Sequence, residues 1–224
     1  MQLKIGRGSK FAYRQVENQG GYSLVELVIT TVISLVVLGA TVSLFTTALD
    51  TRRFQIGRTD ALVSAQAAIN VMSREIGNSG FGLERGEYAS NGLVLGDCNA
   101  TRLHFRTNTG NLNSATTDAG ENVTFYLDTD PTDSTLKAIV RHDNATGERS
   151  GIINQVSNVT FTYYDYDSNG TATAVANPSV NTARVRMTLT VVLADDKTDF
   201  TNKRNVTIES DISLRNAPYN IGQY

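Results

Sequence analysis

The sequence predicts an α+β protein in which one long N-terminal helix packs against a C-terminal antiparallel sheet. Three observations support this fold class. The apolar run from Leu24 to Leu49 contains a single charged residue, Glu26. No proline interrupts residues 22–78, and apolar residues recur at helical spacing in the second half of this stretch. Beyond Gly86 apolar and polar residues alternate, which is the period of a strand with one covered face.

Composition and charge indicate a folded domain with an anchoring segment. The chain has 224 residues, of which 40% are hydrophobic and 19% are charged, and its formal net charge is −2. Such a balance offers no basic surface, so no nucleic-acid partner is expected. Residues 1–21 are basic, however, with four Lys or Arg against Glu17 alone. A basic N-terminal segment indicates that this end of the chain stays on the cytoplasmic side of a membrane, while the acidic remainder crosses it.

The predicted helix has two halves with different surfaces. Residues 22–49 form the first half, whose apolar run is long enough for a transmembrane helix across a ~30 Å hydrocarbon core. Residues 50–82 form an amphipathic second half. Its apolar stripe consists of Leu62, Ile69, Met72 and Ile76. The glycine-rich stretch GNSGFG is the expected end of the helix.

Residues 83–224 are expected to form a globular antiparallel β domain. Each predicted strand has one apolar face, which the helical stripe can cover. The apolar positions are Val123, Phe125 and Leu127; Leu136, Ala138 and Val140; Val159, Phe161 and Tyr163; alternate residues from Val185 to Leu193; and Val206, Ile208, Ile212 and Leu214.

A pair of glycines, Gly20 and Gly21, stands directly before the apolar run. A secretory signal instead places its cleavage site after a shorter apolar run. A secretory-type cut near residues 46–48 and a simple uncleaved anchor are the two alternatives. An uncleaved anchor explains neither the glycine pair nor Glu26.

The stretch G-Y-S-L-V-E, Gly21 to Glu26, followed by an unbroken apolar helix, resembles the processing signal of type IV prepilins and of type II secretion pseudopilins. The resemblance implies that a prepilin peptidase cuts after Gly21, which makes residues 1–21 a leader peptide. It also implies N-methylation of the new first residue, Tyr22, where the family most often has phenylalanine. Glu26 would align an incoming subunit during assembly.

Other stretches extend this resemblance. LGATVSLFTTALDTRRF, INVMSREIGNSGFG, and VSNVTFTYYDYDSNG followed by ARVRMTLTV are similar to segments of PilW-type minor pilins and J-type minor pseudopilins. The resemblance implies a type IV pilin-like fold and a minor pilin that primes a type IV pilus or lies at its tip. The implied partners are the prepilin peptidase, other minor pilins, the major pilin, the inner-membrane assembly platform, and membrane lipid before assembly.

The implied location is the bacterial inner membrane, with the C-terminal domain in the periplasm, and later the pilus at the cell surface. A minor pseudopilin of type II secretion is the first alternative. A membrane-anchored periplasmic binding domain is the second. No motif supports an enzyme: Cys98 and His104 are six residues apart, and nothing places a third catalytic group near them.

A carboxylate within an apolar helix needs a physical reason. Placing a charge in hydrocarbon costs about 2.5–3.5 kcal/mol on insertion scales. Cleavage after Gly21 would create an α-amine on Tyr22, four residues before Glu26. The carboxylate could pair with its own terminus or with that of the next subunit, which is the arrangement that the resemblance implies. Alternatively, Glu26 could extend to the lipid headgroups.

The stretch D-Y-D-S-N-G has the first half of a calcium loop, with Asp165, Asp167 and Asn169 as candidate ligands. The glutamate expected at the twelfth loop position is missing, because Ala176 stands there. A plain turn between two strands explains the same residues. Apart from this candidate Ca²⁺ site, no cofactor is expected.

Overall fold

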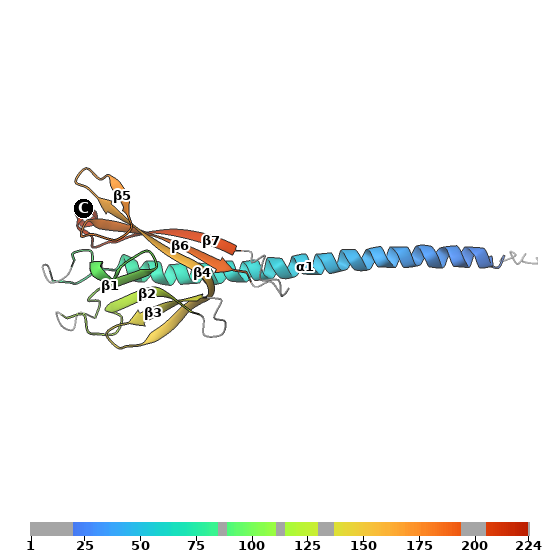
Figure 1. Cartoon of the computed structure of the whole chain (residues 1–224), viewed down its shortest axis with the longest axis horizontal. Helices are drawn as coiled ribbons and strands as arrows, with labels where there is room; N and C mark the ends of the chain where they lie inside the picture. The colour runs from blue at the N-terminus through green and yellow to red at the C-terminus, as the bar shows by residue number, and fades with distance from the viewer. Residues whose placement is uncertain (1–19, 85–88, 111–114, 130–136, 194–204, 224) are drawn as a thin grey trace, which may run out of the picture. The chain divides into compact units, whose positions relative to one another are not determined.

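The computed structural model of the chain describes residues 20–84, 89–110, 115–129, 137–193 and 205–223 (Figure 1). Contacts divide the chain into two compact units, one ending at Thr51 and the other beginning at Arg52. The fold class predicted from the sequence is confirmed, because a long apolar N-terminal helix is followed by an antiparallel sheet against which it packs.

Helix α1, Leu24–Gly77, contains 54 residues. It begins after Ser23, whose carbonyl oxygen accepts the N–H of Leu27 at 3.1 Å. It ends within the predicted glycine-rich stretch. Gly80, just beyond the end, has φ +80°, and a Cβ there would lie 2.8 Å from the carbonyl oxygen of Ser90. Glycine is therefore required at this position for the chain to leave the helix.

Seven strands form one sheet in the order β1-β2-β3-β4-β6-β7, with β5 also paired to β4, and every pairing is antiparallel. The strands are β1 Arg102–Arg106, β2 Asn122–Thr129, β3 Lys137–Asp143, β4 Arg149–Tyr166, β5 Ala172–Val175, β6 Thr182–Val192 and β7 Asn205–Ser213. Two short helical elements, η1 Leu95–Asp97 and α2 Pro218–Ile221, lie outside the sheet.

Strand β4 has 18 residues and changes its neighbours along its length. Its first part, up to Val156, pairs with β3. Pairing with β6 begins at Val156 and continues to Asp165. From Tyr163 to Tyr166, β5 pairs with the opposite edge of β4. The register with β3 shifts twice, so this part of β4 is bulged and bends more sharply than a regular strand.

The core lies between the second half of α1 and the inner face of the sheet. Alternate residues of β4 and β6 are buried there, as the period-two pattern predicts: Val159, Phe161, Tyr163, Val185, Met187, Leu189 and Val191. On the helix, Ile69, Met72 and Ile76 are buried as predicted, whereas Leu62 is only half-buried. Ala65 and Ala68 complete the buried stripe. Their small side chains allow the helix to approach the sheet closely.

An ion pair supports this packing from the polar side of the helix. The Arg141 Nε atom of β3 donates to the Glu75 Oε2 atom of α1 at 2.9 Å, and both side chains are partly buried. Partial burial reduces the screening of this pair by water, so it contributes more than a typical surface pair.

We expect residues 50–224 to form a soluble, folded monomer without the apolar first half of α1. The buried stripe that covers the sheet begins at Ala65 and is intact in this fragment. Analytical ultracentrifugation and amide exchange would measure its state. A matched fragment that starts at residue 78 lacks the stripe and should aggregate, because the apolar face of the sheet is then uncovered. Aggregation of the 50–224 fragment itself would contradict the architecture.

Candidate functional site

The predicted cleavage site lies in non-helical chain just before α1. Gly20 and Gly21 precede the helix, and a Cβ at either position would have no atom within 4 Å. Neither residue has a positive φ. The fold of the described chain therefore does not require glycine at either position. Tyr22 follows with 85% of its surface exposed, so the bond between Gly21 and Tyr22 is accessible to an enzyme.

Glu26 lies in the first turn of α1, with its side chain exposed. A carboxylate near a helix N-terminus is favoured by the partial positive charge of the unpaired N–H groups. Among the described residues, no basic group forms an ion pair with Glu26. The carboxylate is therefore available for a cation from outside this part of the chain.

The first half of α1 presents an apolar surface that no described residue outside the helix covers. Its most apolar 18-residue window has a mean hydropathy of 2.4 and none of it is buried, so α1 is a candidate membrane anchor. Its threonine hydroxyls bond to carbonyls of the same helix; for example, Thr31 Oγ1 donates to the Val28 carbonyl at 2.8 Å and Thr41 Oγ1 to that of Val37 at 2.8 Å. These hydroxyls need no water, so the helix suits lipid or a protein interior.

The predicted calcium ligands lie at the turn between β4 and β5. Both carboxylate oxygens of Asp165 accept hydrogen bonds from side chains before and at the start of β6, Ser179 Oγ at 2.6 Å and Thr182 Oγ1 at 2.5 Å. Asp167 Oδ1 accepts the backbone N–H groups of Asn169 and Thr171 at 2.9 and 2.8 Å. These bonds engage both carboxylate oxygens of Asp165 and one of Asp167 within the protein. In the described part of the chain, no cluster of three His, Cys, Asp or Glu residues could hold a metal.

The Cys98 side chain contacts the backbone of His104. The Cys98 Sγ atom donates to the His104 carbonyl at 3.2 Å and accepts the His104 N–H at 3.3 Å. The nitrogens of the His104 imidazole contact other residues: Nδ1 lies 2.7 Å from Asp97 Oδ2, and Nε2 lies 2.6 Å from Asn122 Oδ1. Burial raises the pKa of the Cys98 thiol to about 11, so it is protonated near neutral pH and is a poor nucleophile.

Asp97 organises this polar cluster. Burial alone raises the pKa of Asp97, but hydrogen bonds from Arg102 and His104 outweigh this effect and bring the pKa below its usual value. The Arg102 Nε atom lies 2.8 Å from Asp97 Oδ1. The alternation along β1 predicts that His104 lies on the polar face; the structure shows that this side chain is nonetheless buried.

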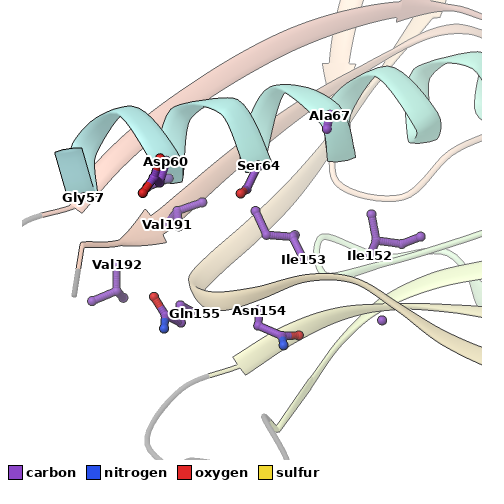
Figure 2. Close-up of a pocket in the computed structure, with 12 residues that line it drawn as sticks. Gly57, Asp60, Ser64, Ala67, Ile152, Ile153, Asn154, Gln155, Val191 and Val192 are labelled. Carbon is purple, nitrogen blue, oxygen red and sulfur yellow. The ribbon is translucent and has the colours of Figure 1, made fainter.

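The sequence does not predict a groove of about 610 Å³ that lies between α1 and the bulged part of β4 (Figure 2). Its lining comes from three separate segments: residues 57–67 of α1, residues 151–155 of β4 and the end of β6. Gln155 has φ +59°, a conformation that is strained for a residue with a side chain. Because the groove depends on how distant segments pack, no local pattern in the sequence indicates it.

Comparison of the chain with protein-family models, curated proteins and solved structures finds no match.

We expect the Cys98 thiol of the folded 50–224 fragment to resist alkylation by iodoacetamide at pH 8 and to react on unfolding. The folded pKa of about 11 exceeds the ordinary value of 9.0. The associated stability is therefore fully present below pH 9 and is lost as the pH rises toward 11, by about 2–3 kcal/mol in all. Denaturant unfolding at several pH values measures this loss.

The control for this experiment is Cys98→Ala, which should be less stable at neutral pH but lack the part of the alkaline loss that belongs to the thiol. Alkylation of the folded fragment at the rate of the unfolded one would contradict the buried position.

Proposed function

We propose that this chain is a minor subunit of a type IV pilus, made as a precursor and cut after Gly21. The observation that carries the proposal is helix α1, whose first half is apolar and exposed while its second half forms the core with the sheet. A helix of this kind can be held in lipid before assembly and by similar helices afterwards. The same observation fits a minor pseudopilin of type II secretion, and the neighbouring genes would separate the two systems.

The glycine pair supports the proposed cleavage. Gly21 has no atom near the place of its missing Cβ and no positive φ, so folding does not explain it. An enzyme that must bring this backbone close to its catalytic groups does explain it. Cleavage would make Tyr22 the first residue, and the same prepilin peptidase would methylate its α-amine.

Glu26 supports the proposed assembly step. Its carboxylate has no ion-pair partner among the described residues, and it is the only charge from Leu24 to Leu49. The protonated α-amine of Tyr22 in a neighbouring subunit would neutralise it at a similar depth. The subunit would wait in the inner membrane with its C-terminal domain in the periplasm, and would join other minor pilins and the major pilin at the assembly platform.

Replacing Gly21 with leucine should block cleavage, because a side chain there would prevent close approach of the peptidase. Mass spectrometry of the membrane fraction, from cells that express the peptidase, measures the mature N-terminus. The matched control is Gly20→Leu, one residue farther from the proposed bond, which should reduce cleavage less. A wild-type chain that keeps residues 1–21, or that begins at Leu49, would refute the proposed signal.

Replacing Glu26 with alanine should leave cleavage intact and prevent co-assembly, because the carboxylate is needed for alignment with the neighbour and not for recognition by the peptidase. The readout is the amount of the chain in sheared pili, beside the amount of cleaved chain in membranes. Glu26→Asp keeps the charge and should retain part of the co-assembly. Wild-type incorporation of the alanine variant would mean that Glu26 has no role in assembly.

A further inference from the structure

Three exposed arginines, Arg52, Arg53 and Arg58, follow the apolar run of α1. In the described part of the chain, none of the three forms an ion pair, a side-chain hydrogen bond or a contact with an aromatic ring. Two aspartates, Asp50 and Asp60, flank them along the helix, so residues 50–60 are basic by one charge. The segment therefore offers three cationic side chains to a partner from outside the described chain.

The three arginines surround the helix instead of occupying one face. At 3.6 residues per turn, Arg53 is about 100° around the axis from Arg52, and Arg58 is about 240° from it. Arg58 lies on the same face as Ala65, two turns further on, which is fully buried. Because Arg58 is exposed, the cover that the sheet provides on this face ends between the two residues. We call these three residues the arginine ring.

The length of α1 relates the arginine ring to the thickness of a membrane. From Glu26 to Arg52 the helix advances about 39 Å, at 1.5 Å per residue. A bilayer is about 40–45 Å thick when its headgroups are included. If Glu26 lies among the headgroups of one leaflet, Arg52 therefore lies among those of the other. Long arginine side chains can extend along the helix to reach a phosphate there.

We propose that the arginine ring binds the phosphates of anionic phospholipid headgroups, on the side of the membrane opposite the N-terminal segment. Headgroups surround a helix on all sides, as the ring does, whereas a folded protein partner would contact one face and leave at least one arginine without an anion. The guanidinium group also suits this ligand, because its planar array of N–H donors can bind a phosphate through two parallel hydrogen bonds.

The orientation of the anchor does not explain these arginines. Basic residues favour the cytoplasmic side of a membrane, and the basic residues 1–21 already provide that signal at the other end of the apolar run. Three arginines beyond the run oppose this bias, so they need a different role. Binding to headgroups supplies one, because it holds the helix at a fixed depth and keeps the sheet domain outside the bilayer.

This inference deepens the proposed function and rests on one part of it, the residence of α1 in a membrane. It depends on neither the cut after Gly21 nor assembly. The test uses the full chain with Phe45→Trp, which introduces its only tryptophan within the apolar run, on the side of Arg52. The chain is placed in vesicles of equal parts phosphatidylglycerol and phosphatidylcholine. One of the two lipids carries bromine near the headgroup end of its acyl chains, where it quenches tryptophan fluorescence.

Brominated phosphatidylglycerol should quench more strongly than brominated phosphatidylcholine. The local ratio of the two lipids should be about two to five times the bulk ratio, the range of an exposed ion pair. Combined replacement of Arg52, Arg53 and Arg58 with glutamine should return the ratio to the bulk value. All three side chains are exposed and glutamine is a good helix former, so the variant should fold. The matched control is Arg74→Gln, an exposed arginine near the end of the same helix, which should preserve the enrichment.

Three results would overturn the proposal. Equal quenching by the two lipids would refute the arginine ring alone and would favour an acidic protein as its partner. Enrichment that persists in the triple glutamine variant would show that another group attracts the anionic lipid. Absence of quenching by either brominated lipid would show that the helix lies outside the bilayer, and would refute both this inference and the membrane-bound stage of the proposed function.

Discussion

The apolar face of the sheet depends on one contact, that with the second half of α1. The buried residues of β4 and β6 would be exposed to water without Ala65, Ile69, Met72 and Ile76. Burial of apolar surface contributes roughly 25 cal/mol per Å², so a helix face of this size is a major source of the domain's stability. The Glu75–Arg141 ion pair also links α1 to the sheet. The groove lies next to this contact, along residues 57–67 of the helix.

Much of the fold could be predicted, because the spacing of apolar residues in a helix or strand shows which one of its faces is buried. The alternation from Val185 to Val191 corresponds to burial on β6, and the spacing of Ile69, Met72 and Ile76 to burial on α1. The first part of β4 could not be predicted, because it is bulged and its sequence does not alternate: two apolar residues, Ile152 and Ile153, directly follow Gly151. Strand β5 could not be predicted either, since its four residues are too few to show a period.

The candidate sites differ in the same way. The proposed Gly21–Glu26 signal is local, and a sequence can suggest such a signal because none of its residues needs a tertiary contact in the described structure. The groove joins three segments far apart in the chain, so the sequence alone could not indicate it. The burial of His104 could not be predicted for a related reason. The groups that contact its imidazole come from the segment that contains Asp97 and from β2. Local patterns can thus suggest sites that would act before or outside folding, whereas sites created by packing need the structure.

Under the proposed function, the contact surface on the apolar half of α1 carries one carboxylate, Glu26. Apolar surface favours association but discriminates weakly between partners and registers. A single charge changes this, because a shifted register leaves a carboxylate without its cation, which is costly in an apolar environment. Transfer of the apolar helix from lipid to a protein interior is nearly neutral for its apolar area. The energy that distinguishes the waiting subunit from the assembled one would then come chiefly from pairing the carboxylate, and specificity would rest on very few residues.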